Sequence, residues 1–159
     1  MTSPQPTDFR KLVSELSQWN NGNGIDIDSW LGFKGNYELA IAFSRLFWPE
    51  FVEHDGCVFF AGFSLESFRG FMAQCNGDRA SVEQVMNHRH LLDIFHHAAD
   101  TATLDQLTFL GTVLRETWRA KLARDFPSRS FEVTFDHADA DDLLEYFVAF
   151  CQPTNWPGS

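Results

Sequence analysis

Four of the six histidines of this 159-residue chain fall within one stretch of eleven positions, NHRHLLDIFHH. On a continuous helix, His90, Asp93 and His97 would lie at i, i+3 and i+7 and share one stripe of the surface. Imidazole and carboxylate groups at this spacing are ligands for Zn²⁺ or a similar divalent ion, with His54 or His137 as a remote further ligand. The sequence therefore contains one candidate metal site, which a metal-dependent enzyme or a metal-binding protein would use.

A competing interpretation starts from the apolar residues around the histidines. Val82 and Met86 mark one helical face, whereas Leu91 and Phe95 mark another face that is rotated from the first. We therefore expect the helix to break near 88–90, which would undo the stripe and leave partly exposed histidines. Because the chain has neither an H-E-x-x-H motif nor a set of cysteines, we expect no bound transition metal and no cofactor. In either case a run of imidazoles titrates near pH 6 to 7.

Two nucleophile motifs are incomplete. The stretch GFSLE contains Ser64 in part of a nucleophile elbow, but Glu66 replaces the second glycine, and Ser64 is more simply a helix N-cap. The three cysteines, Cys57, Cys75 and Cys151, are widely spaced and have no basic neighbour that would lower the pKa of a thiol. We expect reduced thiols that act as small core hydrophobes, and the sequence indicates no catalytic residue.

Acidic residues are concentrated near the C-terminus. No Lys or Arg occurs after Arg129, whereas Asp136, Asp139, Asp141 and Asp142 lie in a loop that we expect between two strands. Two interpretations of this loop stay open, and one is that it projects outward as an anionic docking face for a protein partner, with a cationic partner favoured. The alternative is that the loop folds back over the basic end of the preceding helix and neutralises it.

The composition excludes several classes of function. Twelve basic residues against twenty-two acidic ones give a net charge of −10, which repels phosphate backbones and anionic lipids, so we predict neither nucleic-acid nor membrane binding. The N-terminus has no basic segment followed by an apolar stretch, and no apolar run approaches the length of a membrane span. Together with an odd number of cysteines, these features predict a soluble protein of a bacterial-type cytoplasm.

Local signals predict an α+β fold in a single domain, 1–159, with short flexible ends at roughly 1–6 and 153–159. About five helices should pack on a small, mainly antiparallel sheet. Asp55-Gly56 between two β-prone runs predicts a type I′ hairpin. Ser81 with Gln84, and Thr103 with Gln106, predict capping boxes at the starts of two helices. The apolar helix predicted at 37–48 should be central.

The C-terminal part is predicted to be β-structure. Phe131, Val133 and Phe135 alternate with polar residues, which indicates a strand with one buried face. The stretch LLEYFVAFC after it fits a strand or a helix, and its aromatic and β-branched content favours the strand.

These observations favour a non-enzymatic, acidic interaction protein that binds a protein partner. By size and charge alone, the chain fits the general type of immunity and antitoxin proteins. Two alternatives stay open: the His90, Asp93 and His97 metal site, and a small-molecule binder with a pocket lined by Trp30, Trp48 and nearby phenylalanines.

Overall fold

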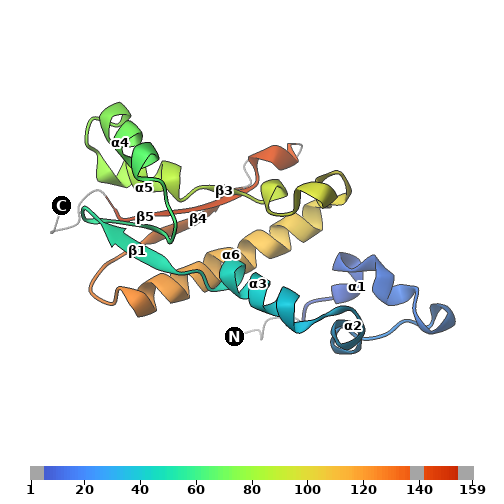
Figure 1. Cartoon of the computed structure of the whole chain (residues 1–159). Coiled ribbons are helices and arrows are strands. Elements are labelled where there is room, and N and C mark those ends of the chain that lie inside the picture. The colour runs from blue at the N-terminus through green and yellow to red at the C-terminus, as the bar shows by residue number, and fades with distance from the viewer. Residues whose placement is uncertain (1–5, 137–141, 154–159) are drawn as a thin grey trace, which may run out of the picture. The chain divides into compact units, whose positions relative to one another are not determined.

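The structure, a computed structural model, describes residues 6–136 and 142–153 and is mixed helix and strand, as the sequence predicts (Figure 1). The chain divides into two compact units. The N-terminal unit ends at Phe43, and the C-terminal unit, which holds both β-sheets, begins at Ser44. Within the described ranges, no helix has the length and apolar character needed to cross a membrane.

Short helices make up the N-terminal unit: α1 (Phe9–Leu12), η1 (Ser14–Ser17), η2 (Asn20–Gly22), α2 (Ile27–Lys34) and the start of α3 (Tyr37–Phe47). Asn36 caps α3, since its Oδ1 accepts a hydrogen bond of 2.9 Å from the backbone N–H of Leu39. Among the described residues up to Phe43, Leu16 alone is buried. The prediction that the apolar helix α3 is central is wrong, because none of its residues is buried.

The strands of the C-terminal unit form two small antiparallel sheets where the sequence predicts one. The first is a hairpin of β1 (Phe51–His54) and β2 (Cys57–Phe60). The second has the order β3-β5-β4, with β3 (Arg89–His90), β5 (Phe147–Cys151) and β4 (Glu132–Asp136). The strand favoured by the sequence near the C-terminus is therefore confirmed as β5, which lies in the middle of its sheet.

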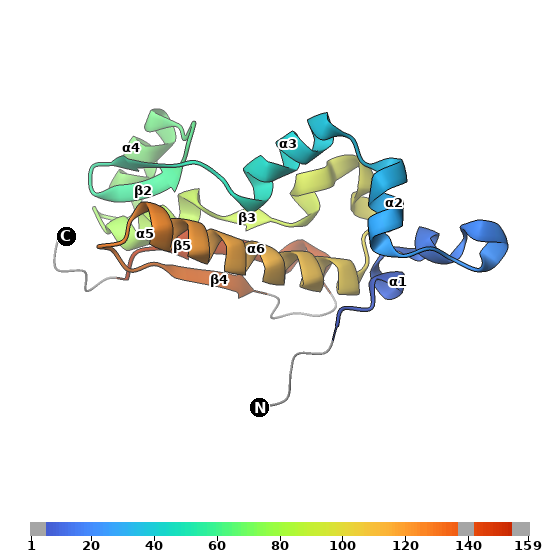
Figure 2. The same cartoon turned by 90° about the horizontal axis from the view of Figure 1, so that it is seen from below.

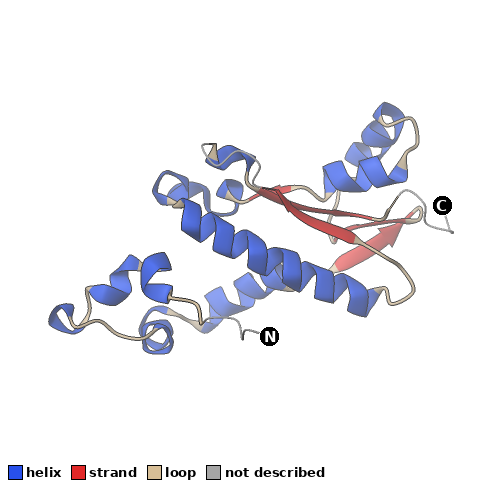
Figure 3. Cartoon of the chain, turned by 180° about the vertical axis from the view of Figure 1, so that it is seen from behind, coloured by secondary structure: helices blue, strands red, loops and turns tan. Residues whose placement is uncertain are grey.

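The helices of this unit are α4 (Leu65–Gln74), α5 (Arg79–Met86), η3 (Leu92–Thr101), α6 (Leu104–Asp125) and η4 (Leu143–Glu145), and Figure 3 distinguishes them from the strands. The capping box of Thr103 and Gln106 is confirmed at the start of α6. The box predicted for Ser81 is wrong: Asp78 is the N-cap of α5, and the hydroxyl of Ser81 donates to the Asp78 carboxylate from within the first turn.

The buried residues gather in two clusters on opposite faces of β2. Val58 packs into the larger cluster, with Leu114, Trp118 and Leu122 of α6 and with side chains of β4 and β5. Cys57 and Phe59 point the other way, into a smaller cluster with α4 and α5. Figure 2 shows α6 running alongside β4 and β5. The position of β2 between the clusters ties α4 and α5 to the rest of the unit.

The hairpin turn is of the predicted type. Asp55 and Gly56 have φ angles of 50° and 79°, and His54 pairs with Cys57, so two residues with positive φ make the turn. We expect Gly56→Val to lower the free energy of unfolding by about 1 kcal/mol or more, because a β-branched side chain disfavours positive φ. Gly56→Asn, whose side chain tolerates this conformation, is the matched control. Urea unfolding measures both, and equal stabilities would contradict the assignment.

Candidate functional site

The histidine-rich stretch does not form one helix. α5 ends at Met86, residues Arg89–His90 form β3, and η3 begins at Leu92. The break that the apolar pattern predicts near 88–90 is therefore confirmed. Its cause is the pairing of β3 with β5, since a backbone that pairs as a strand cannot continue the helix. The helical spacing that would have aligned His90, Asp93 and His97 is absent.

The break brings His88 and His90 together instead. Side chains two apart on an extended backbone point to the same face, and the Nε2 atoms of these two rings lie 3.1 Å apart. His90 Nδ1 lies 2.7 Å from the backbone oxygen of Leu144 in η4. The ring of His88 stacks on Phe147 of β5 at a centroid distance of 4.0 Å. Both imidazoles are thus held from two sides.

This geometry assigns the protons of the neutral pair. A carbonyl oxygen only accepts hydrogen bonds, so Nδ1 of His90 carries its proton and Nε2 of His90 presents a lone pair. Nε2 of His88 is then the donor between the rings. The pKa of His88 is below its ordinary value, first because of burial and then because of the nearby positive charge of His90, whereas Glu145 opposes the shift. The pair therefore disfavours a double positive charge.

The other proposed ligands lie elsewhere. Asp93 and His97 are exposed residues of η3. His54 is in β1, with its ring 4.9 Å from that of Phe68, and His137 lies outside the described residues. In the part of the chain that the structure describes, no three or more His, Cys, Asp and Glu side chains are grouped as a metal site.

A cavity of about 320 Å³ lies between η3 and the first turns of α6. Its apolar wall is made by Leu92, Phe95, Ala98, Ala99, Leu107 and Leu110. A kink at Phe95, with φ −130° and ψ 69°, divides η3 into two turns. Two polar residues also line the cavity, but Thr101 donates to Ala98 O, and Gln106 accepts from the backbone of Thr103. The cavity is therefore suited to an apolar group.

Within residues 91–107, the part of the chain that supplies most of the cavity lining, the exposed carboxylates and the absence of Lys and Arg give the local charge one sign. Asp93 and Asp100 lie on η3 and Asp105 lies in the first turn of α6, and all three are exposed. The stretch from Leu91 to Leu107 contains no Lys or Arg. Negative charge on the same two elements that line the cavity favours a partner whose apolar group is flanked by positive charge.

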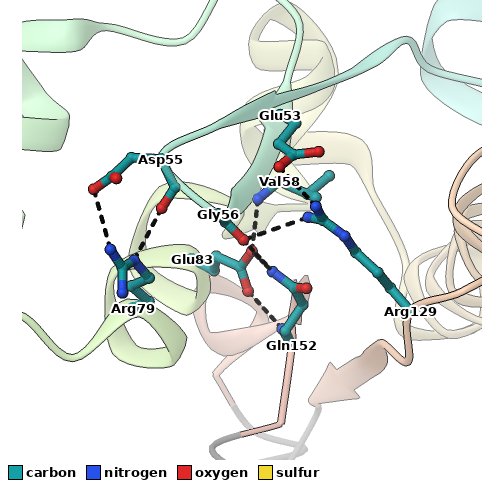
Figure 4. A network of polar contacts seen from close by, with 8 residues as sticks. All are labelled: Glu53, Asp55, Gly56, Val58, Arg79, Glu83, Arg129 and Gln152. Atoms are coloured by element: carbon teal, nitrogen blue, oxygen red, sulfur yellow. Dashed lines mark hydrogen bonds and ion pairs between the residues drawn. The ribbon is translucent and has the colours of Figure 1, made fainter. Parts of the chain in front are cut away.

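Glu83 on α5 is fully buried and links the two sheets (Figure 4). Its Oε1 accepts from the backbone N–H of Val58 at 2.6 Å and from the side-chain amide of Gln152 at 2.7 Å. Its Oε2 accepts from the backbone N–H of Gln152 at 2.5 Å. One turn later, the side chain of Asn87, the C-cap of α5, donates to Val58 O at 2.9 Å. The side chains of Glu83 and Asn87 thus bind backbone groups of β2 and of Gln152, the residue after β5. These backbone groups do not pair with another strand in the described part of the chain.

Burial raises the pKa of Glu83, against the opposing effect of the hydrogen bonds from Gln152 and Val58. A shifted carboxyl group often marks a catalytic site, but this one has no exposed surface through which a substrate could reach it. Burial also raises the pKa of Cys57 to about 12 and that of Cys151 to about 11, so neither thiol is activated. We assign the Glu83 network to structure.

The acidic docking residues are only partly described. Asp136 ends β4 opposite Phe147, and Asp142 caps η4 through a 3.0 Å bond from the N–H of Leu144. Asp139 and Asp141 lie outside the described residues. The docking role of this loop therefore stays a prediction.

Lys121, in the last turns of α6, and Arg129, after the end of that helix, already have acidic neighbours. Arg129 lies 2.7 Å from Glu53, and Lys121 pairs with Asp125. Neither acid belongs to the C-terminal acidic loop.

The remaining candidates have ordinary structural surroundings. Ser64 is confirmed as the N-cap of α4, since its hydroxyl accepts from Ser67 N–H at 3.1 Å. Trp30 and Trp48, the aromatic residues proposed to line a small-molecule pocket, belong to different units. Trp48 lies near Lys121 and Arg124, whose charged groups are 5.9 and 6.0 Å from its ring. These are cation–π contacts on the surface of the C-terminal unit.

Sequence reasoning missed the cavity and the role of His88. The cavity residues are ordinary apolar and alanine positions, and no sequence signal distinguishes them. The pair His88 and His90 carries a signal, because His-x-His places both rings on one face if the backbone is extended. The sequence patterns predict a helix from Ser81 and a break near 88–90, but they do not indicate that the backbone at the break is extended.

No protein-family model, curated protein or solved structure matches this chain significantly.

Proposed function

We propose that this chain is a non-enzymatic binding protein that holds an apolar anchor residue of a cationic protein partner in the cavity between η3 and α6. The observation that carries the proposal is the cavity itself, an apolar space of about 320 Å³ between two elements that also carry exposed aspartates. The proposed partner is of the cationic class that the net charge favours. The proposed binding surface, however, is formed by η3 and α6 and not by the C-terminal acidic loop.

The chemistry of the wall favours a side chain over a free small molecule. Small-molecule sites combine an apolar wall with a few polar groups that fix the ligand's orientation. Here the side chains of Thr101 and Gln106 already make hydrogen bonds within the chain. An apolar anchor needs no such group, because the partner's own backbone and flanking charges orient it.

Site-specific photo-crosslinking tests the proposal. Phe95 is 37% exposed and lines the cavity, so a photoreactive benzoyl-phenylalanine fits there with little change in shape. Trp48, at 40% exposure, is the matched control. Trp48 lies near Lys121, so its surroundings are basic. Lys121 is about 20 Å along α6 from Leu107, which lines the cavity. The probe at position 95 should capture one segment rich in Lys and Arg that carries an apolar residue, and the control should not.

Changing the border charges supplies the second arm of this test. We expect capture at position 95 to fall with rising salt and to fall when Asp93, Asp100 and Asp105 are replaced by Asn, because charge complementarity speeds association. Capture of the same segments from both probe positions, or capture of acidic segments, would contradict the proposal. Circular dichroism of each variant verifies that the fold is retained.

A further inference from the structure

We propose that His88 and His90 form a bidentate site for a divalent transition metal ion. This site is separate from the cavity and uses a different set of ligands from the stripe of His90, Asp93 and His97. The proposal also reverses the expectation from the sequence that the chain binds no transition metal. That expectation rests on the helix break near 88–90, and this same break brings His88 and His90 together.

The backbone holds the two rings in place. Arg89 pairs with Val148 and His90 pairs with Phe147, so the short strand β3 is fixed to the middle strand of its sheet. The intervening Arg89 points to the opposite face, where its guanidinium lies 4.7 Å from the ring centre of Phe60. Its positive charge is therefore directed away from the face on which the imidazoles meet.

The partners of the rings are those that a metal-binding histidine uses. An imidazole that binds a metal through one nitrogen usually donates its other N–H to a carbonyl or carboxylate, which fixes the tautomer and raises the basicity of the ligand. His90 makes this contact through Nδ1 to Leu144 O at 2.7 Å. The stacking of His88 on Phe147 restricts rotation of the second ring.

The spacing of the nitrogens fits one ion. Metal–imidazole bonds are about 2.0–2.1 Å long, so an ion bonded to both Nε2 atoms, which are 3.1 Å apart, would see them at an angle of about 98°. This angle lies between the value of about 90° in square-planar sites and that of about 109° in tetrahedral ones. The distance between the two nitrogens therefore allows one ion to bond to both, once the rings turn their lone pairs toward it.

Binding displaces one proton from between the rings. In the neutral pair, Nε2 of His88 carries the proton that Nε2 of His90 accepts. When the ion takes both lone pairs, that proton moves to Nδ1 of His88, so the neutral protein releases none. If the pair carries one positive charge, one proton is released to solvent. The negative charge of Glu145, which is close enough to act on His88, favours a cation here.

Two imidazoles leave the other coordination positions to water. Since the described residues contribute no group of three ligands, the affinity depends on the ion's preference for imidazole. For nitrogen ligands, that preference rises from Co²⁺ through Ni²⁺ to Cu²⁺ and falls again at Zn²⁺. We therefore expect Cu²⁺ to bind most tightly, Ni²⁺ next, and Mg²⁺ or Ca²⁺ not measurably.

Titration of the full chain, without an affinity tag, with Cu²⁺ tests the site. We expect one ion per chain and an electron paramagnetic resonance spectrum that reports two coordinated nitrogens. His88→Gln and His90→Gln should each weaken binding at least about tenfold, since one ligand is lost. The matched control is the double variant His96→Gln, His97→Gln, which removes two adjacent exposed histidines and should leave binding unchanged.

Thermal unfolding gives a second readout that does not depend on spectroscopy. Cu²⁺ should raise the Tm of the wild-type protein and of the control variant, because the ion binds only the folded arrangement of the pair, and it should not raise that of the single variants. The proposal is wrong if the His96, His97 variant loses the ion, or if His88→Gln and His90→Gln bind it as tightly as the wild type. A folded wild-type protein that binds no Cu²⁺ also overturns it.

Discussion

Replacing Gly111 by alanine is expected to lower the free energy of unfolding by about 1–3 kcal/mol, although alanine is the better helix former. Gly111 lies in the middle of α6, against Phe135 of β4. A Cβ atom added there would lie 2.3 to 2.6 Å from three ring carbons of Phe135, well inside van der Waals contact. Helix propensity alone would stabilise the alanine variant by about 0.5–1 kcal/mol, so overpacking must reverse the sign.

Gly70 in α4 is the matched control. A Cβ atom there would meet nothing within 4 Å, so Gly70→Ala should stabilise the protein by about 0.5–1 kcal/mol through helix propensity. A smaller side chain at position 135 should relieve the clash, so Gly111→Ala combined with Phe135→Leu should cost less than the sum of the two single changes. Urea unfolding of the four variants measures this coupling. Additive effects, or stabilisation by Gly111→Ala, would show that α6 and β4 are not packed as described.

Replacing Glu83 by leucine is expected to lower the free energy of unfolding by about 3–5 kcal/mol, as loss of one partner from a buried polar network does. Leucine removes both acceptor oxygens but nearly preserves the volume. The backbone N–H groups of Val58 and Gln152 would then be buried without an acceptor. Gln84, an exposed neighbour on the same helix, supplies the control: Gln84→Leu should change stability by no more than about 0.5 kcal/mol.

The pH dependence separates the charge of Glu83 from its hydrogen bonds. Because burial raises the pKa of Glu83, the folded protein retains this proton at pH values where the unfolded chain has released it. The free energy of unfolding should therefore fall as the pH rises from the ordinary value of 4.5 through the raised pKa. Glu83→Gln does not titrate and should lack this component. The raised pKa would be contradicted if wild type and Glu83→Gln differed in free energy of unfolding by the same amount at about pH 4 and at about pH 7.

The sequence determined those elements whose signals are contained in a few neighbouring residues. The hairpin at Asp55-Gly56 follows from a turn in which both residues need positive φ. The start of α6 follows from reciprocal bonds between Thr103 and Gln106, three positions apart. The alternation around Val133 follows from the period of a strand with one buried face. Each signal acts over one turn or one strand, so it is present before any tertiary contact forms.

Predictions from local sequence patterns were wrong where another part of the structure, not contained in the pattern, decided the outcome. Ser81 has the spacing of a capping box, but Asp78 occupies the N-cap position of α5, and its carboxylate accepts a hydrogen bond from the hydroxyl of Ser81. The apolar composition of α3 indicates burial, yet Tyr37 is 90% exposed. An apolar composition means that burial of the helix would be favourable, but it does not determine whether another surface covers the helix.

Only the tertiary structure decided the surroundings of His90 and Glu83, because their hydrogen-bond partners are far apart in the sequence. His90 meets the carbonyl of Leu144 across 54 positions, and Glu83 meets Gln152 across 69. Such contacts depend on the register of β3 against β5, and that register is set by packing of the whole core rather than by residues 87–97 alone. His90, which the helical stripe would group with Asp93 and His97, is thus paired with His88 instead, because pairing of β3 with β5 interrupts the helix.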